Sequence, residues 1–292
     1  KGSVMIVAIN YANDPYKKTQ KYCTHSAYKY GVDKVFEYGP KDIDIDFYKK
    51  NKSILDQKRG NGYWLWKPYI ISETLKKIEY GDFLLYIDAG SYFIGNVNNL
   101  LKCMENNGDD IISFELPFIE RQWTKKEIFN YFKCDQDKSI IDTCQRIATF
   151  IILKKTRRTV EFIEKYLKVA QVDHLITDEL DNEIQDRNFI ENRHDQSIFS
   201  VLAKIENVPV YKDPSEYGVQ PQLLSESYPK AIFKEVCYEH GNYSQILVLH
   251  RKKKVTAYVR LMSFIRSKFS WKIYRKLLKY QKVVLEILKG KK

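Results

Sequence analysis

The sequence lacks the features that would assign it to several common classes. It has no run of about 18 apolar residues, so no membrane-spanning helix is expected. Its five cysteines are scattered, odd in number and without a C-x-x-C pair, which argues against a zinc ribbon or a disulfide framework and for a reducing compartment. Internal repeats and low-complexity linkers are missing as well. A chain of 292 residues is long enough to bury the core of one large domain, or of one domain plus an appendage.

The positive charge of the chain is concentrated at its C-terminal end. The formal net charge is +12, yet the segment from Arg251 to Lys292 holds 15 Lys or Arg and one acid, a balance of +14. The rest of the chain therefore carries −2. A sequence pI of 9.2 suggests a non-enzymatic nucleic-acid-binding protein. A nearly neutral body without a basic stripe makes that interpretation weaker.

The basic segment has the pattern of an amphipathic helix. Between Val255 and Leu288, apolar residues recur at steps of three and four, while Lys and Arg occupy the opposite side. A basic amphipathic helix with Trp and Phe is typical of a segment that lies on an anionic membrane surface. The alternative is a helix packed on the body with a solvated basic face. We predict that residues 251–292 form a separate helical arm.

The body alternates between short apolar, β-rich runs and amphipathic segments. The β-rich runs predict strands at Val4–Asn10, Lys34–Tyr38, Asp82–Asp88, Asp110–Leu116 and Arg146–Leu153. The amphipathic segments predict helices at Pro15–Tyr30, Lys67–Tyr80, Val97–Asn107 and Thr156–Val169. This alternation predicts an α/β fold with a single, mostly parallel, Rossmann-like sheet and helices on both faces.

Capping patterns predict two further helices. Thr124 with Glu127 forms a capping box for a helix through Phe132. Asp195 is placed to cap a helix that runs through Ile205.

A lone aspartate ends the strand predicted at Asp82–Asp88. In α/β sheets, ligands gather just beyond the carboxyl ends of strands. Asp88 is followed by two small residues, Ala89 and Gly90. A carboxylate with so little bulk beside it suits a metal ion that carries a phosphorylated ligand. The alternative is an aspartate that opens an ordinary turn.

The segment from Arg59 to Pro68 combines glycines, aromatic rings and two cations. Arg59 and Lys67 bracket the flat faces of Tyr63, Trp64 and Trp66. A loop of this kind leading into a helix can hold a nucleotide diphosphate, with cations and backbone N–H groups on phosphate and a ring on base or sugar. The alternative is a hydrophobic cluster that covers the end of the sheet, and we expect at least one Trp to take that role.

Two histidines lie near element ends. His194 and Asp195 precede an apolar helix and are candidates for handling a proton or steadying an acceptor hydroxyl, although capping alone explains Asp195. His250 ends the apolar run Leu247–Leu249, where an imidazole could complete a metal site beside Asp88. A surface histidine at a strand end is the alternative.

Taken together, these motifs resemble a known family. An opening strand, an Arg-bearing aromatic loop before a helix, and a strand ending in "YIDAG" look like bacterial sugar-nucleotide-dependent glycosyltransferases of the glycosyltransferase A fold. The capsular-polysaccharide and lipopolysaccharide transferases are the most similar, and glycogenin-like enzymes are more distant. The resemblance covers about Met5 to His250, and it implies that residues 1–250 form the catalytic domain. "HDQSIF" looks like the family's D-Q segment near the acceptor.

The resemblance implies roles for particular residues. Asp88 would contact metal or ribose, and His250 would be a second ligand of Mn²⁺ or Mg²⁺. Arg59 and Lys67 would hold the diphosphate, while Asp195 would lie near the reacting sugar. The nucleotide pocket would include Asn10 and Tyr11 together with the rings of Tyr63 and Trp66. The second Asp of the family's D-x-D motif is Gly90 here, which puts the strength of metal binding in doubt.

The expected activity is hexosyl transfer from a nucleotide sugar such as a UDP-sugar to a polysaccharide or lipid-linked acceptor, in bacterial surface glycan synthesis. If Met5 is the native start, the chain enters its first strand without a secretion signal, and we expect a cytoplasmic enzyme held on the inner face of the membrane by its arm. The rival enzyme is a sugar-phosphate nucleotidyltransferase. Against it, "NYANDPYKK" stands where a Gly-rich loop bearing a Lys would follow the first strand.

Overall fold

A computed structural model describes residues 3–180, 185–224, 228–251 and 253–268, together with residues 273 and 276. The strands are β1 (Ile6–Tyr11), β2 (Lys34–Tyr38), β3 (Phe83–Ile87), β4 (Ser91–Phe93), β5 (Ile111–Ile119), β6 (Cys144–Arg146), β7 (Phe150–Lys154), β8 (Val210–Tyr211) and β9 (Leu247–Leu249). The helices of ten or more residues are α1 (Lys17–Lys29), α5 (Trp66–Leu75), α6 (Asn98–Asn107), α9 (Arg157–Ala170), α11 (Asp195–Ile205) and α13 (Ala257–Lys268).

Shorter helical segments connect these elements. They are α2 (Ile45–Lys50), α3 (Lys52–Leu55), α4 (Gly60–Tyr63), α7 (Lys126–Tyr131), α8 (Lys138–Ile141), α10 (Asp173–Ile176) and α12 (Glu216–Val219). Among the described residues, 3-10 turns lie at Asp14–Tyr16, Pro40–Asp42, Glu120–Gln122 and Pro221–Leu223.

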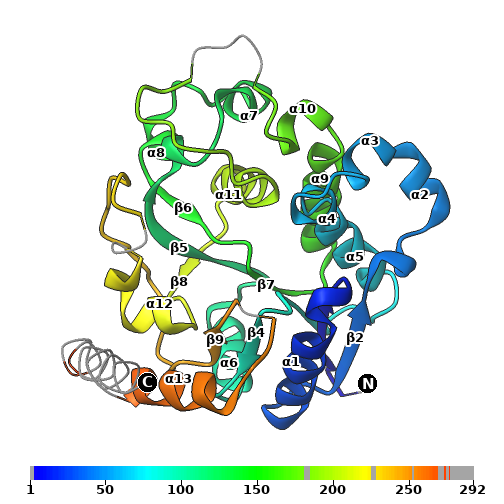
Figure 1. Cartoon of the computed structure of the whole chain (residues 1–292), viewed down its shortest axis with the longest axis vertical. Helices are drawn as coiled ribbons and strands as arrows, with labels where there is room; N and C mark the ends of the chain where they lie inside the picture. The colour runs from blue at the N-terminus through cyan, green and yellow to red at the C-terminus, as the bar shows by residue number, and fades with distance from the viewer. Residues whose placement is uncertain are drawn as a thin grey trace, which may run out of the picture.

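The main sheet has seven strands in the part of the chain that the structure describes. Its order is β2-β1-β3-β7-β5-β6, and β8 pairs with β5 (Figure 1). Strands β2, β1, β3, β5 and β8 run in one direction, whereas β7 and β6 run antiparallel to their neighbours. The predicted α/β class with a mostly parallel sheet is therefore confirmed. Strands β4 and β9 form a separate antiparallel pair.

Helices cover the sheet on both faces, because its central strands β1, β3 and β7 are buried and mostly apolar on both sides. In β1, the side chains of Val7, Ile9 and Tyr11 pack in the same core as α5, α9 and α11. Ile6 and Ala8 point the other way, into a second core that includes α1, α6 and β9. This alternation decides which residues of a strand can reach a ligand site on one face.

One predicted strand is wrong in its extent. The apolar run Arg146–Leu153 is not continuous: β6 ends at Arg146, and β7 begins at Phe150. β5 lies between these two strands in the sheet, so the chain crosses from one edge of β5 to the other. Both strands are buried, so the sequence stays apolar through the crossing and does not show the break.

Both predicted caps are also wrong. Thr124 donates its hydroxyl hydrogen bond to Glu120 (2.6 Å), and α7 begins without a side-chain cap. Asp195 is the first residue of α11, where it caps no backbone N–H group and instead forms an ion pair. In both cases another buried partner, Glu120 for Thr124 and Lys67 for Asp195, takes the side chain that could have capped the helix.

The arm is described only in its first part. Helix α13 follows β9 and packs near α12 at one end of the molecule (Figure 1). Most of the amphipathic segment predicted beyond Lys268 lies outside the described residues. None of the helices in the described ranges combines the length and the apolar character needed to cross a membrane.

Candidate functional site

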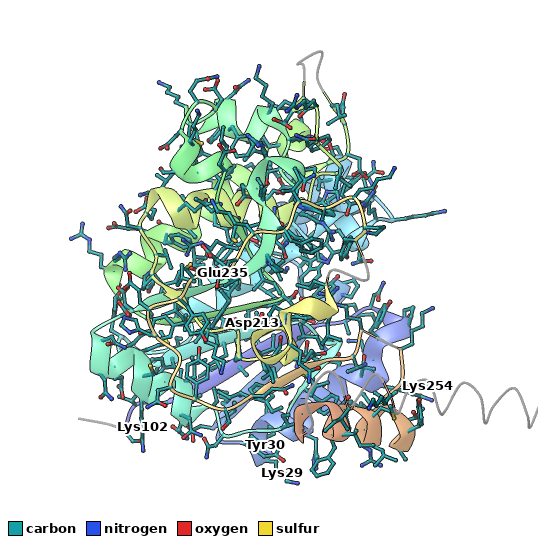
Figure 2. All side chains as sticks on the ribbon, turned by 90° about the vertical axis from the view of Figure 1, so that its left-hand side faces the viewer. Lys29, Tyr30, Lys102, Asp213, Glu235 and Lys254 are labelled. Carbon is teal, nitrogen blue, oxygen red and sulfur yellow. The ribbon has the colours of Figure 1, made fainter. Side chains whose placement is uncertain are left out.

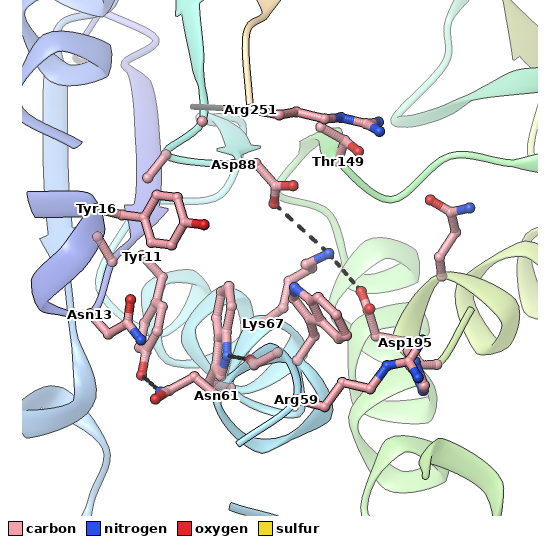
Figure 3. Close-up of a pocket in the computed structure, with 18 of the residues that line it drawn as sticks. Tyr11, Asn13, Tyr16, Arg59, Asn61, Lys67, Asp88, Thr149, Asp195 and Arg251 are labelled. Carbon is pink, nitrogen blue, oxygen red and sulfur yellow. Dashed lines mark hydrogen bonds and ion pairs between the residues drawn. The ribbon is translucent and has the colours of Figure 1, made fainter. Parts of the chain in front are cut away.

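A cleft of about 580 Å³ opens at one rim of the main sheet (Figure 3). Its wall includes Tyr11 at the end of β1, Asp88 directly after β3, and Thr149 before the antiparallel strand β7. Carboxyl ends of parallel strands meet at one edge, which is where α/β proteins place their ligands. The rest of the wall comes from the chain around α4 and α5, from the start of α11, and from Arg251 after β9.

Asp88 reaches the cleft from the end of β3. Its backbone N–H donates to Thr149 O (2.9 Å), which ties the loop to the neighbouring strand. The buried Tyr86 hydroxyl donates to the carboxylate of Asp88. Burial and the nearby Asp88 charge raise the pKa of Tyr86 well above its usual range, so the phenol keeps its proton. The Asp88 side chain is 34% exposed, which leaves one side of it open to a ligand.

Lys67 joins two carboxylates at the floor of the cleft (Figure 3). Its ammonium lies 2.6 Å from Asp195 Oδ2 and 4.0 Å from Asp88 Oδ1, and it donates to Ala148 O (2.9 Å). Asp195 is buried, and burial raises its pKa, although the attraction of Lys67 opposes that rise. Lys67 lies on the cleft wall, but its charge is used mainly to hold these two carboxylates together.

The aromatic wall of the cleft is built by an unusual turn. All five residues from Gly60 to Trp64 have positive φ, including Asn61 (55°), Tyr63 (48°) and Trp64 (60°). Residues other than glycine rarely adopt this left-handed backbone conformation, and strain of this kind clusters at functional sites. Asn61 Nδ2 donates to the Tyr11 hydroxyl (2.5 Å) and so ties the turn to β1.

The two tryptophans of this segment play different parts. Trp66 is buried and stacks on Tyr11, with ring centroids 3.8 Å apart, and its indole N–H donates to Gly60 O (2.9 Å). Trp66 is therefore the member of the pair that joins the core, as expected for at least one of them. Trp64 is only half-buried and stacks near His194, with centroids 5.3 Å apart.

The predicted pair His194 and Asp195 is split between two environments. His194 Nδ1 lies 2.9 Å from Ile176 O, and the ring packs between Tyr63 and Trp64. Burial lowers its pKa to about 4, so the imidazole is neutral at pH 7. His194 lines the cleft and supports its aromatic wall, but a base this weak accepts a proton poorly at neutral pH.

Arg59 lines the outer part of the cleft. Its guanidinium pairs with Asp178 (2.9 Å) and Glu191 (3.6 Å). The hydroxyl of Tyr63 donates to the same Asp178 carboxylate (3.1 Å). Tyr63 is not among the cleft-lining residues, so the prediction of direct nucleotide contact fits its position poorly.

Two other predicted residues do not face the cleft. Asn10 is buried on the α1 side of β1, where its Nδ2 donates to Thr24 (3.2 Å). Neighbours in a strand point to opposite faces, so Asn10 and Tyr11 could not both enter one pocket. His250 is buried, with its ring beside Tyr92 (centroids 5.7 Å apart), and it is not part of the cleft wall.

The structure adds Gln196 to the site. A buried chain of polar groups sets its amide orientation. Glu120 pairs with Lys204 (2.6 Å) and accepts a hydrogen bond from Gln145 Nε2 (3.0 Å). Gln145 Oε1 then accepts from Gln196 Nε2 (2.8 Å), and Gln196 Oε1 accepts from the Ala148 N–H (3.2 Å). Because a carboxylate only accepts, Glu120 dictates the direction of both amides.

Arg251 also lines the cleft and was not predicted there. The sequence gives little signal for it, because it opens a run of four basic residues that reads as part of the arm. The useful signal is its position directly after an apolar strand.

A divalent cation fits this set of side chains poorly. Of the two predicted ligands, only Asp88 faces the cleft, and its carboxylate already has Tyr86 and Lys67 as partners. In the described ranges, no cluster of three or more His, Cys, Asp or Glu side chains could hold a metal ion. A cation bound at Asp88 would also be repelled by the buried Lys67 ammonium. The donor set therefore does not match the predicted Mn²⁺ or Mg²⁺ site.

Comparisons with known proteins gave only remote similarities. No family model and no curated protein match the sequence. Among solved structures, mouse xyloside xylosyltransferase 1 has 9% identity and a TM-score of 0.45, over 84% of this chain and 97% of that one. An active-site mutant of LgtC has 11% identity and a TM-score of 0.46, over 92% and 99%.

A third similar structure is the glycosyltransferase GlyE of Streptococcus pneumoniae. It has 10% identity and a TM-score of 0.45, over 96% of this chain and 64% of that one.

Proposed function

We propose that the protein is a glycosyltransferase that moves a sugar from a nucleotide-diphosphate sugar to a glycan or lipid-linked acceptor. One observation carries the proposal: Lys67 holds Asp88 and Asp195 together at the floor of a cleft at the carboxyl rim of the sheet. Paired carboxylates can bind the hydroxyl groups of sugars through charge-assisted hydrogen bonds.

The charge of the cleft favours an anionic donor. Its wall carries five cations, Lys58, Arg59, Lys67, Arg193 and Arg251, against three carboxylates, Asp88, Glu191 and Asp195. This positive surplus contrasts with the slightly negative body of the chain outside the arm. A surplus of fixed cations beside aromatic faces suits a diphosphate linked to a base and a sugar.

Each residue of the cleft floor and wall has a separate role in this proposal. Asp88, at the open side of the floor, accepts hydrogen bonds from donor hydroxyl groups. Asp195, held by Lys67 and by the Tyr166 hydroxyl (3.1 Å), faces the reacting sugar with a fixed negative charge. Trp64 offers the half-buried ring of the wall to the base or the sugar. The sugar–diphosphate bond breaks with its electron pair on the departing diphosphate, whose charge the surrounding cations stabilise.

The arm supplies a reason for a lipid-linked acceptor. On α13, Tyr258, Leu261 and Phe264 are about half exposed (49%, 57% and 58%) and recur every third residue. Lys254 lies three residues before this helix, and Lys29 and Lys102 project at the same end of the molecule (Figure 2). Exposed apolar side chains among basic ones suit an anionic lipid surface. Binding there would raise the local concentration of a lipid-anchored acceptor.

The proposal is tested by screening nucleotide sugars for thermal stabilisation and for release of nucleoside diphosphate. A true donor at a hundredfold excess over its dissociation constant should stabilise the fold by about 2.7 kcal/mol. Asp88→Asn should lower turnover by roughly 100-fold or more, since it removes a charge at the reacting ligand. Asp46→Asn is the matched control, because Asp46 is an exposed carboxylate on α2 away from the cleft.

Other outcomes would change the assignment. Release of pyrophosphate in place of nucleoside diphosphate would indicate a nucleotidyltransferase. Stabilisation by no nucleotide sugar, together with equal activity of the Asp88 and Asp46 variants, would refute the proposed site.

A further inference from the structure

We propose that Arg251, in place of a divalent cation, neutralises the diphosphate of the donor in this cleft. The inference rests on the proposed function and names the group that binds the charged part of its substrate.

The backbone of Arg251 is fixed against the loop that carries Asp88. Its N–H donates to Gly90 O (3.0 Å), directly after the β4–β9 pairing. Its φ is +51°, a left-handed conformation that a residue with a long side chain rarely adopts. A Cβ on Gly90 would lie only 3.3 Å from Arg251 Cα. Glycine at position 90 therefore allows this close approach.

This conformation places the Arg251 side chain across the cleft beside Asp88 and Thr149 (Figure 3). His250 and Arg251 follow the same strand, yet His250 is buried beside Tyr92 and Arg251 lines the cleft. The left-handed residue at the strand end thus presents a guanidinium to the ligand space.

The guanidinium of Arg251 is also available for a ligand. Within the described ranges it forms no ion pair with a carboxylate, although its charge acts on the buried Asp213 carboxyl, and its central carbon lies 5.8 Å from the centre of the Tyr217 ring. The other cleft cations near the floor are already engaged: Lys67 with Asp195, and Arg193 with Glu191 (3.0 Å). Lys58 also forms no ion pair with a described residue, but it lies on the exposed segment that precedes the left-handed turn.

The geometry suits a diphosphate. A guanidinium presents a planar fork of N–H donors that can bind two phosphate oxygens at once. It also supplies positive charge beside Asp88 without requiring further carboxylate ligands, which the described part of the cleft does not offer to a metal. The Arg251 guanidinium therefore supplies the positive charge that stabilises the departing diphosphate.

The test is calorimetric binding of UDP, GDP and ADP, and of the matching monophosphates, to the full-length protein with EDTA or with Mn²⁺. We expect the best diphosphate to bind in EDTA with an affinity within about threefold of that in Mn²⁺. Arg251→Ala should weaken diphosphate binding by about 10- to 100-fold, the range for a charged hydrogen-bond partner, and should affect the monophosphate less. The diphosphate affinity of Arg251→Lys should lie between those of the wild type and of Arg251→Ala.

Two controls keep the result interpretable. Arg157→Ala removes an exposed arginine on α9 that is not part of the cleft wall, and it should leave binding unchanged. Arg251→Gln keeps most of the length of the side chain, and all three Arg251 variants should retain the wild-type melting temperature. If Arg251→Ala does not fold, Arg251→Gln decides the outcome.

The failure of this inference differs from the failure of the proposed function. Binding that needs Mn²⁺ and is lost in EDTA would overturn the role of Arg251 while leaving nucleotide-sugar transfer in place. Equal binding by wild type and Arg251→Gln would overturn it as well. If no nucleoside diphosphate binds under either condition, the proposed function itself is wrong.

Discussion

Lys67 shows how a single residue can serve a site without being the group that binds the substrate. The sequence places it at the start of a helix beside aromatic rings, which suggests a phosphate contact. In the structure its side chain is only 4% exposed, and its ammonium is occupied by Asp195 and Ala148 O. A buried cation costs free energy unless it is paired, so its main effect is on the carboxylates around it.

We predict that Lys67→Met destabilises the protein by about 3–5 kcal/mol, because it leaves Asp195 buried without its cation. The double variant Lys67→Met/Asp195→Leu should recover much of this loss. Urea unfolding of both single variants and the double variant forms a cycle that measures the coupling. Additive losses would show that the two charges do not depend on each other.

Asp213 provides a prediction about pH. It is buried after β8, and burial raises its pKa from 3.8 to about 7. A carboxyl group with a raised pKa in the folded state contributes stability that is complete below pH 4 and is lost as pH rises through 7. Relative to the neutral variant Asp213→Asn, the free energy of unfolding of the wild type should fall by up to about 4 kcal/mol between pH 4 and pH 8. The measurement is urea unfolding of both proteins at a series of pH values.

A pH dependence shared by the wild type and Asp213→Asn would exclude a titration of Asp213. If the stabilities of wild type and Asp213→Asn change in parallel over that range, Asp213 does not take up a proton on folding. His194 should show the reverse trend below pH 6.5, because burial lowers its pKa to about 4. The two groups can therefore be separated by the direction of the pH effect.

At the scale of elements, the left-handed turn at α4 carries the aromatic wall. Gly62 has a φ of +96°, and a Cβ there would lie 2.8 Å from Leu55 Cα. Gly81 has nearly the same φ, +98°, but a Cβ there would meet no described atom within 4 Å. These two glycines separate backbone strain from steric overlap, since only Gly62 combines both.

We predict that Gly62→Ala destabilises the protein by more than Gly81→Ala, which should cost about 1–2 kcal/mol from backbone strain alone. The overlap with Leu55 should also shift the turn and weaken nucleotide binding, whereas Gly81→Ala should leave binding unchanged. Thermal unfolding and nucleotide titration measure the two effects. Equal losses for both variants would mean that the turn tolerates a side chain at position 62.

Element boundaries were predictable where local patterns decide them. The strand at Lys34–Tyr38 is confirmed to the residue, and Thr156 caps α9 at the predicted start. The break between β6 and β7 was not predictable, because it depends on which edge of β5 each strand pairs with. Pairing partners are far away in sequence, and a buried strand has the same apolar pattern on either edge.

At the scale of the whole molecule, the concentration of positive charge in the arm predicts that the arm binds the protein to anionic membranes. Removal of Val255–Lys292 should abolish binding to anionic phosphatidylglycerol vesicles while leaving donor hydrolysis in solution intact. Each Lys or Arg near an anionic surface contributes about 1 kcal/mol, so binding should weaken in high salt. Co-sedimentation with anionic and with neutral vesicles measures the difference.

A milder variant keeps the charge of the arm and removes its apolar contact. Leu261→Ser with Phe264→Ser changes two exposed side chains of α13 and should lower vesicle binding without changing the fold. Vesicle binding that survives removal of the arm would place the lipid-binding surface on the body instead.

Local sequence patterns were enough to predict the α/β class, the place of Asp88 at a strand end and the concentration of positive charge in the last residues. These properties follow from periodicity and composition, which neighbours along the chain carry. The folded chain was needed to show that Lys67 joins Asp88 to Asp195, that Asn10 and His250 turn away from the cleft, and that Arg251 turns toward it. Ion pairs and strand pairing bring together residues far apart in sequence, and the direction of each side chain depends on the face its element buries.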